Sequence, residues 1–265
     1  MDTITTQDLI IGLSIPFIGT TLGSLMVFFM KDQLSSKVEK GLMGFAAGIM
    51  IAASFWSLLS PALDMASKTS SVPWLSVSLG FLVGVFFLLL LDHLIPHLHP
   101  DSNKPEGLGT KDFKKSTMLF LAITLHNIPE GMAVGIVYAG VLANSSLITV
   151  SGALALSLGI AIQNFPEGAI VSMPLRASGL TKTNSAILGT LSGLVEPIAA
   201  IITIMLAKYI IEAMPFLLAF AAGAMIYVVA DELLPSNKVG EHSHYGLISM
   251  AFGFVLMMTL DVALG

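Results

Sequence analysis

Two copies of the motif N-x-P-E-G lie in the middle of apolar stretches long enough to cross a membrane. The first copy is LHNIPEGMAV, which contains Glu130, and the second is IQNFPEGAIV, which contains Glu167. A third glutamate, Glu196 in SGLVEPIAA, also lies near the middle of an apolar stretch. A carboxylate within hydrocarbon costs about 2.5–3.5 kcal/mol on insertion scales, so such residues usually face a cavity and have a function. The three glutamates therefore predict a polar site inside the membrane.

Other polar residues surround these glutamates at helical spacing. His126 lies four residues before Glu130, and Gln163 lies four residues before Glu167, so each pair shares one helix face. An asparagine lies about 100° round each of these two helices. A proline adjoins each glutamate, removes one backbone N–H and disturbs the carbonyl four residues earlier. The candidate ligands are His126, Asn127, Glu130, Gln163, Asn164, Glu167 and Glu196.

An imidazole, three carboxylates and several amides inside a membrane suit a divalent metal ion. His and carboxylate ligands suit zinc, and oxygen-rich sites suit manganese or iron. The double charge of the ion would also compensate the buried carboxylates. A single His–Glu pair could instead be a structural hydrogen bond, but the duplicated motif and Glu196 favour a metal site. Met50 in GIMIAAS could add a thioether ligand, although methionines in membrane helices more often serve packing.

The elements that carry these residues are predicted to be membrane-spanning helices. The chain is 55% hydrophobic and 11% charged, whereas a soluble domain carries about a quarter charged residues. The apolar stretches do not alternate with polar residues, which excludes a β-barrel. We expect an all-α polytopic membrane protein whose residues 1–265 form a single transmembrane domain. Its eight spans are expected at about 9–30, 41–62, 74–92, 116–138, 148–174, 185–209, 214–233 and 245–264.

The basic residues predict the orientation of these spans. Ten of the twelve Lys and Arg residues fall on one side of the predicted membrane, and only Lys68 and Lys208 fall on the other. Because the side richer in Lys and Arg is cytoplasmic, we expect both termini to be extracellular or periplasmic and the polar stretch of about 93–115 to be a cytoplasmic loop. The start, MDTITTQDLI, has no basic segment typical of a signal peptide, so the first span is expected to stay. The absence of cysteine excludes thiolate metal sites.

Two internal repeats relate spans that run in opposite directions. FAAGIMI at 45–51 returns as FAAGAMI at 220–226, and the N-x-P-E-G motif of the fourth span returns in the fifth. Inverted repeats of this kind are typical of transporters, and we expect a 3+2+3 arrangement of the spans. Small-residue motifs such as AAG also recur by chance in membrane helices, which is an alternative for the first pair but a poor one for the second.

The motifs H-N-x-P-E-G and Q-N-x-P-E-G resemble those of the ZIP family of divalent-metal transporters over the whole chain. Gln163 makes the resemblance closest to the bacterial GufA-like branch. The resemblance implies a two-metal site between the fourth, fifth and sixth spans, formed by the seven candidate ligands with a contribution from Met50, and it suggests a homodimer. Two features depart from the family: Asn164 stands where relatives often carry Asp or His, and the long His-rich loop of many eukaryotic members is absent.

Further polar residues lie towards the two predicted membrane surfaces. Asp64 and Asp261 lie near the outer ends of the second and eighth spans, where they could gather cations or be ordinary interfacial charges. Five of the six histidines fall on the predicted cytoplasmic side, as a relay that receives metal would require, although solvated loop histidines are the alternative. The family resemblance favours four exit ligands: Asp92, His97, His99 and Glu232.

The predicted function is import of Zn²⁺ into the cytoplasm across a bacterial plasma membrane, with Fe²⁺, Mn²⁺ or Cd²⁺ as further substrates. The alternative is an intramembrane metalloenzyme or metal sensor that retains its metal. An enzyme usually carries H-E-x-x-H or a similar signature, and the chain contains none. The duplicated ligands of an inverted repeat also suit transport better than hydrolysis. No nucleotide-binding P-loop is present, so this chain is not expected to drive transport by ATP hydrolysis.

Overall fold

A computed structural model describes residues 4–29, 35–98, 104–110, 114–143, 148–207, 211–234 and 244–264. Within these ranges the only β-structure is one isolated antiparallel bridge between His97 and Glu106. Eight helical elements are long and apolar enough to cross a membrane, which confirms the predicted all-α polytopic fold. The predicted exit ligand His99 lies outside the described residues.

The eight spans are built from the following elements: α1 (Thr6–Leu25) with the 3₁₀ turn η1 (Met26–Phe28), α2 (Ser36–Ala53) with the π-helix η2 (Ser54–Leu59) and α3 (Ser60–Thr69), α4 (Pro73–Leu94), α5 (Lys115–Leu142), α6 (Val150–Ala177), α7 (Lys182–Gly193) with α8 (Val195–Ala207), α9 (Met214–Val228) with the π-helix η5 (Val229–Leu233), and α11 (Tyr245–Leu264). A further 3₁₀ turn, η4 (Ile211–Ala213), precedes α9.

Two spans differ from the expected ranges. The second is one helical element from Ser36 to Thr69, because Pro61 lies in the first turn of α3, directly after the wide turns of η2, and does not end the helix. The sixth is broken at Leu194, where α7 ends and α8 begins. The break lies next to Pro197, whose missing N–H weakens the helix at that point.

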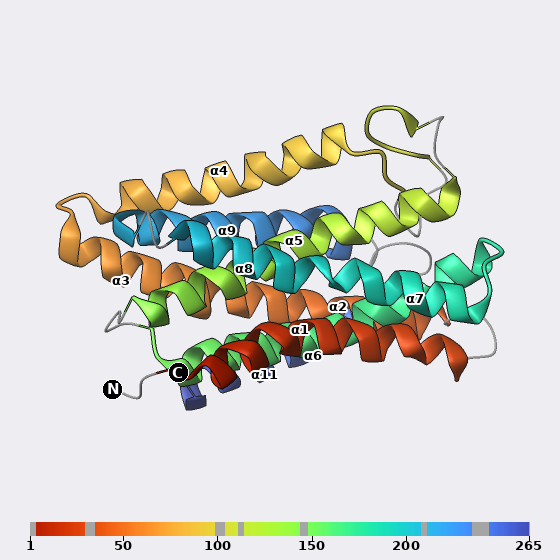
Figure 1. Cartoon of the computed structure of the whole chain (residues 1–265), viewed down its shortest axis with the longest axis horizontal. Helices are drawn as coiled ribbons and strands as arrows, with labels where there is room; N and C mark the ends of the chain where they lie inside the picture. Colours follow the sequence, from red (N-terminus) through yellow and green to blue (C-terminus); the bar gives the residue numbers. More distant parts are fainter. Residues whose placement is uncertain are drawn as a thin grey trace.

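The helices form two groups of four spans. α1, α5, α6 and the α7–α8 pair pack together in the first group, and α2–α3, α4, α9 and α11 pack together in the second. The groups meet mainly where α2 contacts α6 and where α5 contacts α9. α4 runs along one edge of the bundle beside α9, and α1 begins at the same end at which α11 finishes (Figure 1).

The packing reproduces the inverted repeat that the sequence predicts. Within the first group α1 packs on α6 and α8 packs on α5; within the second α4 packs on α9 and α11 packs on α2. Within each group, the repeat relates one pair to the other, since the first three spans correspond to the last three and α5 corresponds to α6. The π-helices also correspond, because η2 and η5 follow the two FAAG motifs at the same distance. Chance recurrence of small residues does not explain this match.

Glycines make the close approaches that hold the second group together. A methyl group at Gly84 would lie 2.0 Å from the Phe220 carbonyl oxygen, and one at Gly253 would lie 2.1 Å from the Phe45 carbonyl oxygen. Phe45 and Phe220 are the first residues of the two FAAG motifs. The glycines that end these motifs, Gly48 and Gly223, approach carbonyl oxygens of α11 and α4 in the same way. Small residues at such positions let membrane helices pack closely.

Alanine at Gly48 or Gly223 should destabilise the protein, because the added methyl would lie 2.0 Å from a backbone oxygen in both cases. We expect each substitution to cost about 1–3 kcal/mol, as overpacking does, and to lower the thermal unfolding temperature of the detergent-solubilised protein. Gly41→Ala is the control, since its methyl would come no closer than 3.5 Å to Ser249 Oγ. Equal unfolding temperatures for the three variants would contradict this account of the packing.

Candidate metal site

The predicted ligands come from three helices of the first group. His126, Asn127 and Glu130 lie on α5, and Gln163, Asn164 and Glu167 lie on α6, each carried by a helix that continues through its internal proline. Glu196 lies in the first turn of α8, directly after the break. The packing of α5 on both α6 and α8 brings the three segments together.

Each motif asparagine donates to a backbone carbonyl of a neighbouring helix. Asn127 Nδ2 lies 3.0 Å from the Ser192 carbonyl oxygen, and Asn164 Nδ2 lies 3.3 Å from the Pro16 carbonyl oxygen. The two bonds are related by the inverted repeat. The two bonds therefore fix how α5 lies against α7 and how α6 lies against α1.

Amide and hydroxyl groups hold two of the carboxylates. Gln163 Nε2 donates to Glu130 Oε1 across the α5–α6 interface. Glu196 accepts on both oxygens: Asn164 Nδ2 lies 2.8 Å from Oε2, and Thr20 Oγ1 lies 2.8 Å from Oε1. Glu130 and Glu196 are almost fully buried, and their charges interact with each other and with Glu167. The three glutamates therefore form one electrostatically coupled cluster.

Four buried oxygen atoms of this cluster lack a hydrogen-bond partner among the described residues: Glu130 Oε2, Gln163 Oε1, Asn164 Oδ1 and Glu167 Oε1. A buried acceptor without a partner costs about 1–3 kcal/mol, and more when it is charged. All four come from predicted ligands, and all are carboxylate or amide oxygens. Unpaired carboxylate and amide oxygens of this kind are the donors that a hard or borderline divalent cation takes as ligands.

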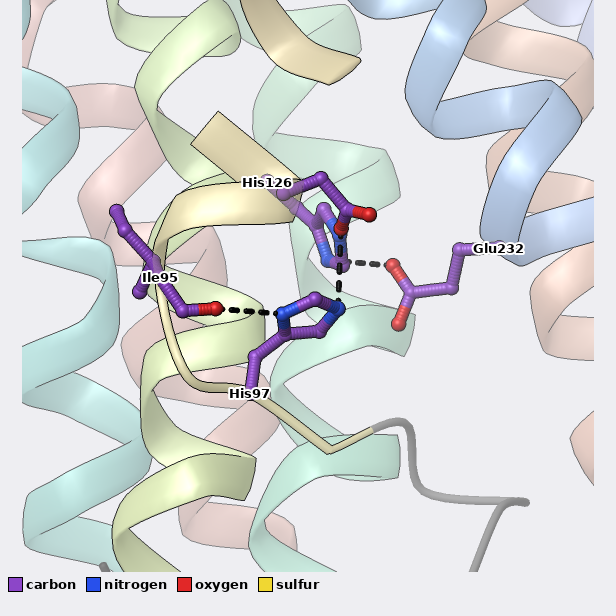
Figure 2. Close-up of polar contacts among 5 residues, drawn as sticks. Ile95, His97, His126 and Glu232 are labelled. Atoms are coloured by element: carbon purple, nitrogen blue, oxygen red, sulfur yellow. Dashed lines mark hydrogen bonds and ion pairs between the residues drawn. The ribbon is translucent and has the colours of Figure 1, made fainter. Parts of the chain in front are cut away.

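His126 connects the cluster to the second group of helices. Its Nδ1 forms an ion pair with Glu232 Oε2 on η5 (Figure 2). A carboxylate at one ring nitrogen is the usual partner of a metal-binding histidine, because it orients the ring and leaves the other nitrogen to bind the ion. The sequence assigned Glu232 to a separate exit group; in the structure it contacts the central site directly, and its charge also acts on Glu167.

A second cluster lies where α4 ends. His97 Nδ1 lies 2.9 Å from the Ile95 carbonyl oxygen, and Nε2 lies 3.0 Å from Asp92 Oδ1 (Figure 2). Since a carbonyl can only accept, Nδ1 must donate, and Nε2 faces the Asp92 carboxylate, with which it forms an ion pair when the ring is protonated. Glu106 is joined to His97 by the β-bridge, and one ligand atom from each of the three residues lies within 4.8 Å of the others. The sequence predicted Asp92 and His97 among four exit ligands, together with His99 and Glu232, but it missed Glu106.

The predicted entrance residues line one cavity at the opposite end of α4. Asp64 and Asp261 both border a space of about 220 Å³ between η2–α3, α5, α6 and α11. Ser57 Oγ donates to Asp261 Oδ2 at 2.7 Å. The structure therefore places these two carboxylates on the wall of one cavity, and their role as entrance residues stays a prediction.

Met50 is fully buried in the apolar core on α2, so its role as a ligand stays a prediction. Thr20 on α1 contacts Glu196 but was missed by the sequence reasoning. A threonine in an apolar stretch gives no local signal of a contact 176 residues away.

A polytopic helical bundle with an inverted repeat and a buried cluster of carboxylates, amides and one histidine is the architecture of an integral membrane metal-ion transporter. Residues 8–117 and 113–261 match the family model described as ZIP Zinc transporter. The chain belongs to the ZIP zinc transporter family. It is therefore a multi-pass membrane protein that transports metal ions, and it is not an enzyme.

Relatives of this family resemble the chain over most of its length. It is 35% identical to Zinc transporter ZIPB of Bordetella bronchiseptica, with 97% of this chain and 81% of the relative covered. It is 34% identical to Zinc transporter GufA of Myxococcus xanthus, with 93% and 94% covered. Zinc transporter ZIP11 of Xenopus tropicalis is 33% identical, again with 93% and 94% covered.

Asn127→Ala should destabilise the protein even without metal, because the Ser192 carbonyl would lose its buried donor. We expect a cost of about 1–3 kcal/mol, measured as a lower thermal unfolding temperature in detergent with a metal chelator present. Asn184→Ala is the control, since Asn184 is an exposed residue of α7. An unfolding temperature equal to that of the control would mean that the Asn127 bond does not contribute to the packing of α5 on the sixth span.

Proposed function

We propose that the protein imports Zn²⁺ into the cytoplasm through the cluster formed by α5, α6 and α8. The observation that carries the proposal is the set of four buried, unpaired oxygens on predicted ligands, together with the oriented His126 ring. His and carboxylate ligands suit zinc, and the oxygen-rich donor set suits Mn²⁺ and Fe²⁺ as further substrates, with Cd²⁺ as another candidate. The names of the zinc-transporting relatives support zinc as the main substrate.

We infer a binuclear centre from the charge of the cluster. Three coupled carboxylates carry more negative charge than one divalent ion compensates. The inverted repeat supplies two related ligand sets, one containing His126 and Glu130 and the other containing Gln163 and Glu167. Two ions bound between these sets, with Glu196 completing the second position, would match both the charge and the symmetry of the ligands.

The route begins at the outer cavity and ends at the cluster at the end of α4. Asp64 and Asp261 attract the cation to the mouth, since a cleft lined by one sign of charge raises the local concentration of the opposite sign. After the central site, the ion reaches Asp92, His97 and Glu106, whose imidazole and carboxylates form a partly exposed site. The excess of Lys and Arg on that side supports its assignment as cytoplasmic, in a bacterial plasma membrane.

Movement of one helix group against the other would open the site to each side in turn. All seven predicted central ligands belong to the first group, whereas Met50, Asp92 and Glu232 belong to the second. The ion would therefore move with the first group and exchange contacts with the second. The His126–Glu232 pair joins the groups in this structure, so breaking it is part of the motion.

Zinc entry into proteoliposomes tests the proposal directly. A zinc-sensitive dye inside vesicles that contain the purified protein should report saturable entry, and a His126→Ala/Glu167→Ala variant should abolish it, because the variant removes two central ligands. Glu212→Gln, which alters an exposed carboxylate on η4, is the control. Zinc that is retained by the wild type without crossing the membrane would contradict transport and favour a sensor or an enzyme that keeps its metal.

Neutralising the outer mouth should weaken capture of the ion without slowing its passage. We expect Asp64→Asn/Asp261→Asn to raise the KM for zinc by about tenfold at low ionic strength, with little change in maximal rate and a smaller effect in high salt. The kinetics of zinc entry would be compared with those of Glu212→Gln, a carboxylate change outside the cavity. A fall in maximal rate at unchanged KM would contradict the entrance role.

A further inference from the structure

The first span contributes to the central site through a residue that occupies the repeat position of Glu196. The α5 motif asparagine contacts Ser192, four residues before Glu196, and the α6 motif asparagine contacts Pro16, four residues before Thr20. The repeat that relates α5 to α6 therefore relates Glu196 to Thr20.

The close helix contacts give the same correspondence independently. A methyl group at Gly131, directly after the α5 glutamate, would lie 2.3 Å from the Glu196 carbonyl oxygen. A methyl group at Gly168, directly after the α6 glutamate, would lie 2.3 Å from the Thr20 carbonyl oxygen. One half of the repeat thus places the Glu196 carboxylate residue beside α5, and the other half places the hydroxyl residue Thr20 beside α6.

The hydroxyl is directed at the carboxylate. Thr20 is 2% exposed and Glu196 is 1% exposed, and Thr20 Oγ1 lies 2.8 Å from Glu196 Oε1. The other acceptor near this hydroxyl, the Pro16 carbonyl oxygen of its own helix, is farther away at 3.5 Å. Because a hydroxyl has a single proton to donate, Glu196 is its principal partner.

Gly193 creates the space for this contact. A methyl group at Gly193 would lie 2.7 Å from Thr20 Cβ and 3.0 Å from Thr20 Oγ1, so the threonine packs directly on the end of α7, where the sixth span breaks. Asn164 holds the other oxygen of the same carboxylate. Both carboxylate oxygens of Glu196 are therefore held, one by α1 and the other by α6. This is so although Glu196 lies in the first turn of α8, directly after the break in the sixth span.

We propose that Thr20 is a positioning residue that orients Glu196 for metal binding and makes α1 part of the metal site. This inference rests on the proposed transport function. Loss of the hydroxyl would let the carboxylate turn and would remove a hydrogen bond to a charged group. Such bonds contribute enough to change an equilibrium constant about tenfold or more.

Thr20→Val keeps the shape of the side chain and removes the donor, so we expect it to raise the KM for zinc by about tenfold while the maximal rate changes less. Thr20→Ser, which keeps the hydroxyl, should restore the wild-type KM. Thr21→Val is the matched control, since the Thr21 hydroxyl bonds to the Phe17 carbonyl of its own helix. Zinc entry into proteoliposomes supplies the kinetics for all variants.

Two further measurements separate positioning from a structural role. The rise in unfolding temperature caused by zinc should shrink in Thr20→Val while the unfolding temperature with chelator stays at the Thr21→Val value, because weaker binding stabilises less. In a Glu196→Gln background, Thr20→Val should add little, since coupled residues are not additive.

The possible failures are distinguishable. If the wild type neither binds nor carries zinc, the proposed function fails. If the wild type carries zinc and Thr20→Val matches Thr21→Val, or if Thr20→Val has its full effect in the Glu196→Gln background, the positioning role is overturned. A lower unfolding temperature in chelator for Thr20→Val, with unchanged KM, would mean that the threonine only packs the helices.

Discussion

The burial of three interacting carboxylates inside a membrane is the constraint around which the rest of the molecule is arranged. Each would be costly alone, and their mutual repulsion adds to the cost. The protein offsets part of it with donors drawn from other helices, including Gln163, Asn164 and Thr20. Among the residues that the structure describes, four acceptors of the cluster nevertheless remain without a hydrogen-bond partner. This residual deficit of hydrogen-bond donors and positive charge is what would draw a divalent ion to the proposed site.

The inverted repeat explains how such a site can be assembled from apolar helices. Related pairs of helices approach through glycines and carbonyl oxygens, as at Gly84 and Gly253 in one group and at Gly131 and Gly168 in the other. Close backbone approach brings the motif asparagines within reach of carbonyls on the neighbouring helices. The same packing therefore provides both stability and the positions of the ligands.

The two halves of the site are nevertheless unequal. In the inverted repeat, His126 corresponds to Gln163 and Glu196 corresponds to Thr20. At each of these two positions, one half of the repeat carries a charged or strongly coordinating group, and the other half carries a group that binds metal ions less strongly. The stronger groups also contact different partners, since His126 pairs with Glu232 of the second helix group and Glu196 is held within the first. A symmetric bundle thus carries an asymmetric centre, which suits a site that must take up an ion from one side and release it to the other.

The sequence by itself determined the eight spans and their repeat relation and selected the candidate ligands of the central cluster, because apolar length, intramembrane charge and i,i+4 spacing are local properties that need no knowledge of the fold. It did not determine the break at Leu194 to the residue or the extension of the second span to Thr69, since prolines such as Pro129 and Pro61 are tolerated within continuous helices.

Only the tertiary structure decided which distant groups meet. The Thr20–Glu196 bond, the His126–Glu232 pair and the place of Glu106 beside His97 each depend on how helices or loops pack across the chain. Spacing along one helix predicts which residues share a face, but it does not predict which face of another helix lies opposite. That choice is made by the close packing of small residues throughout the bundle.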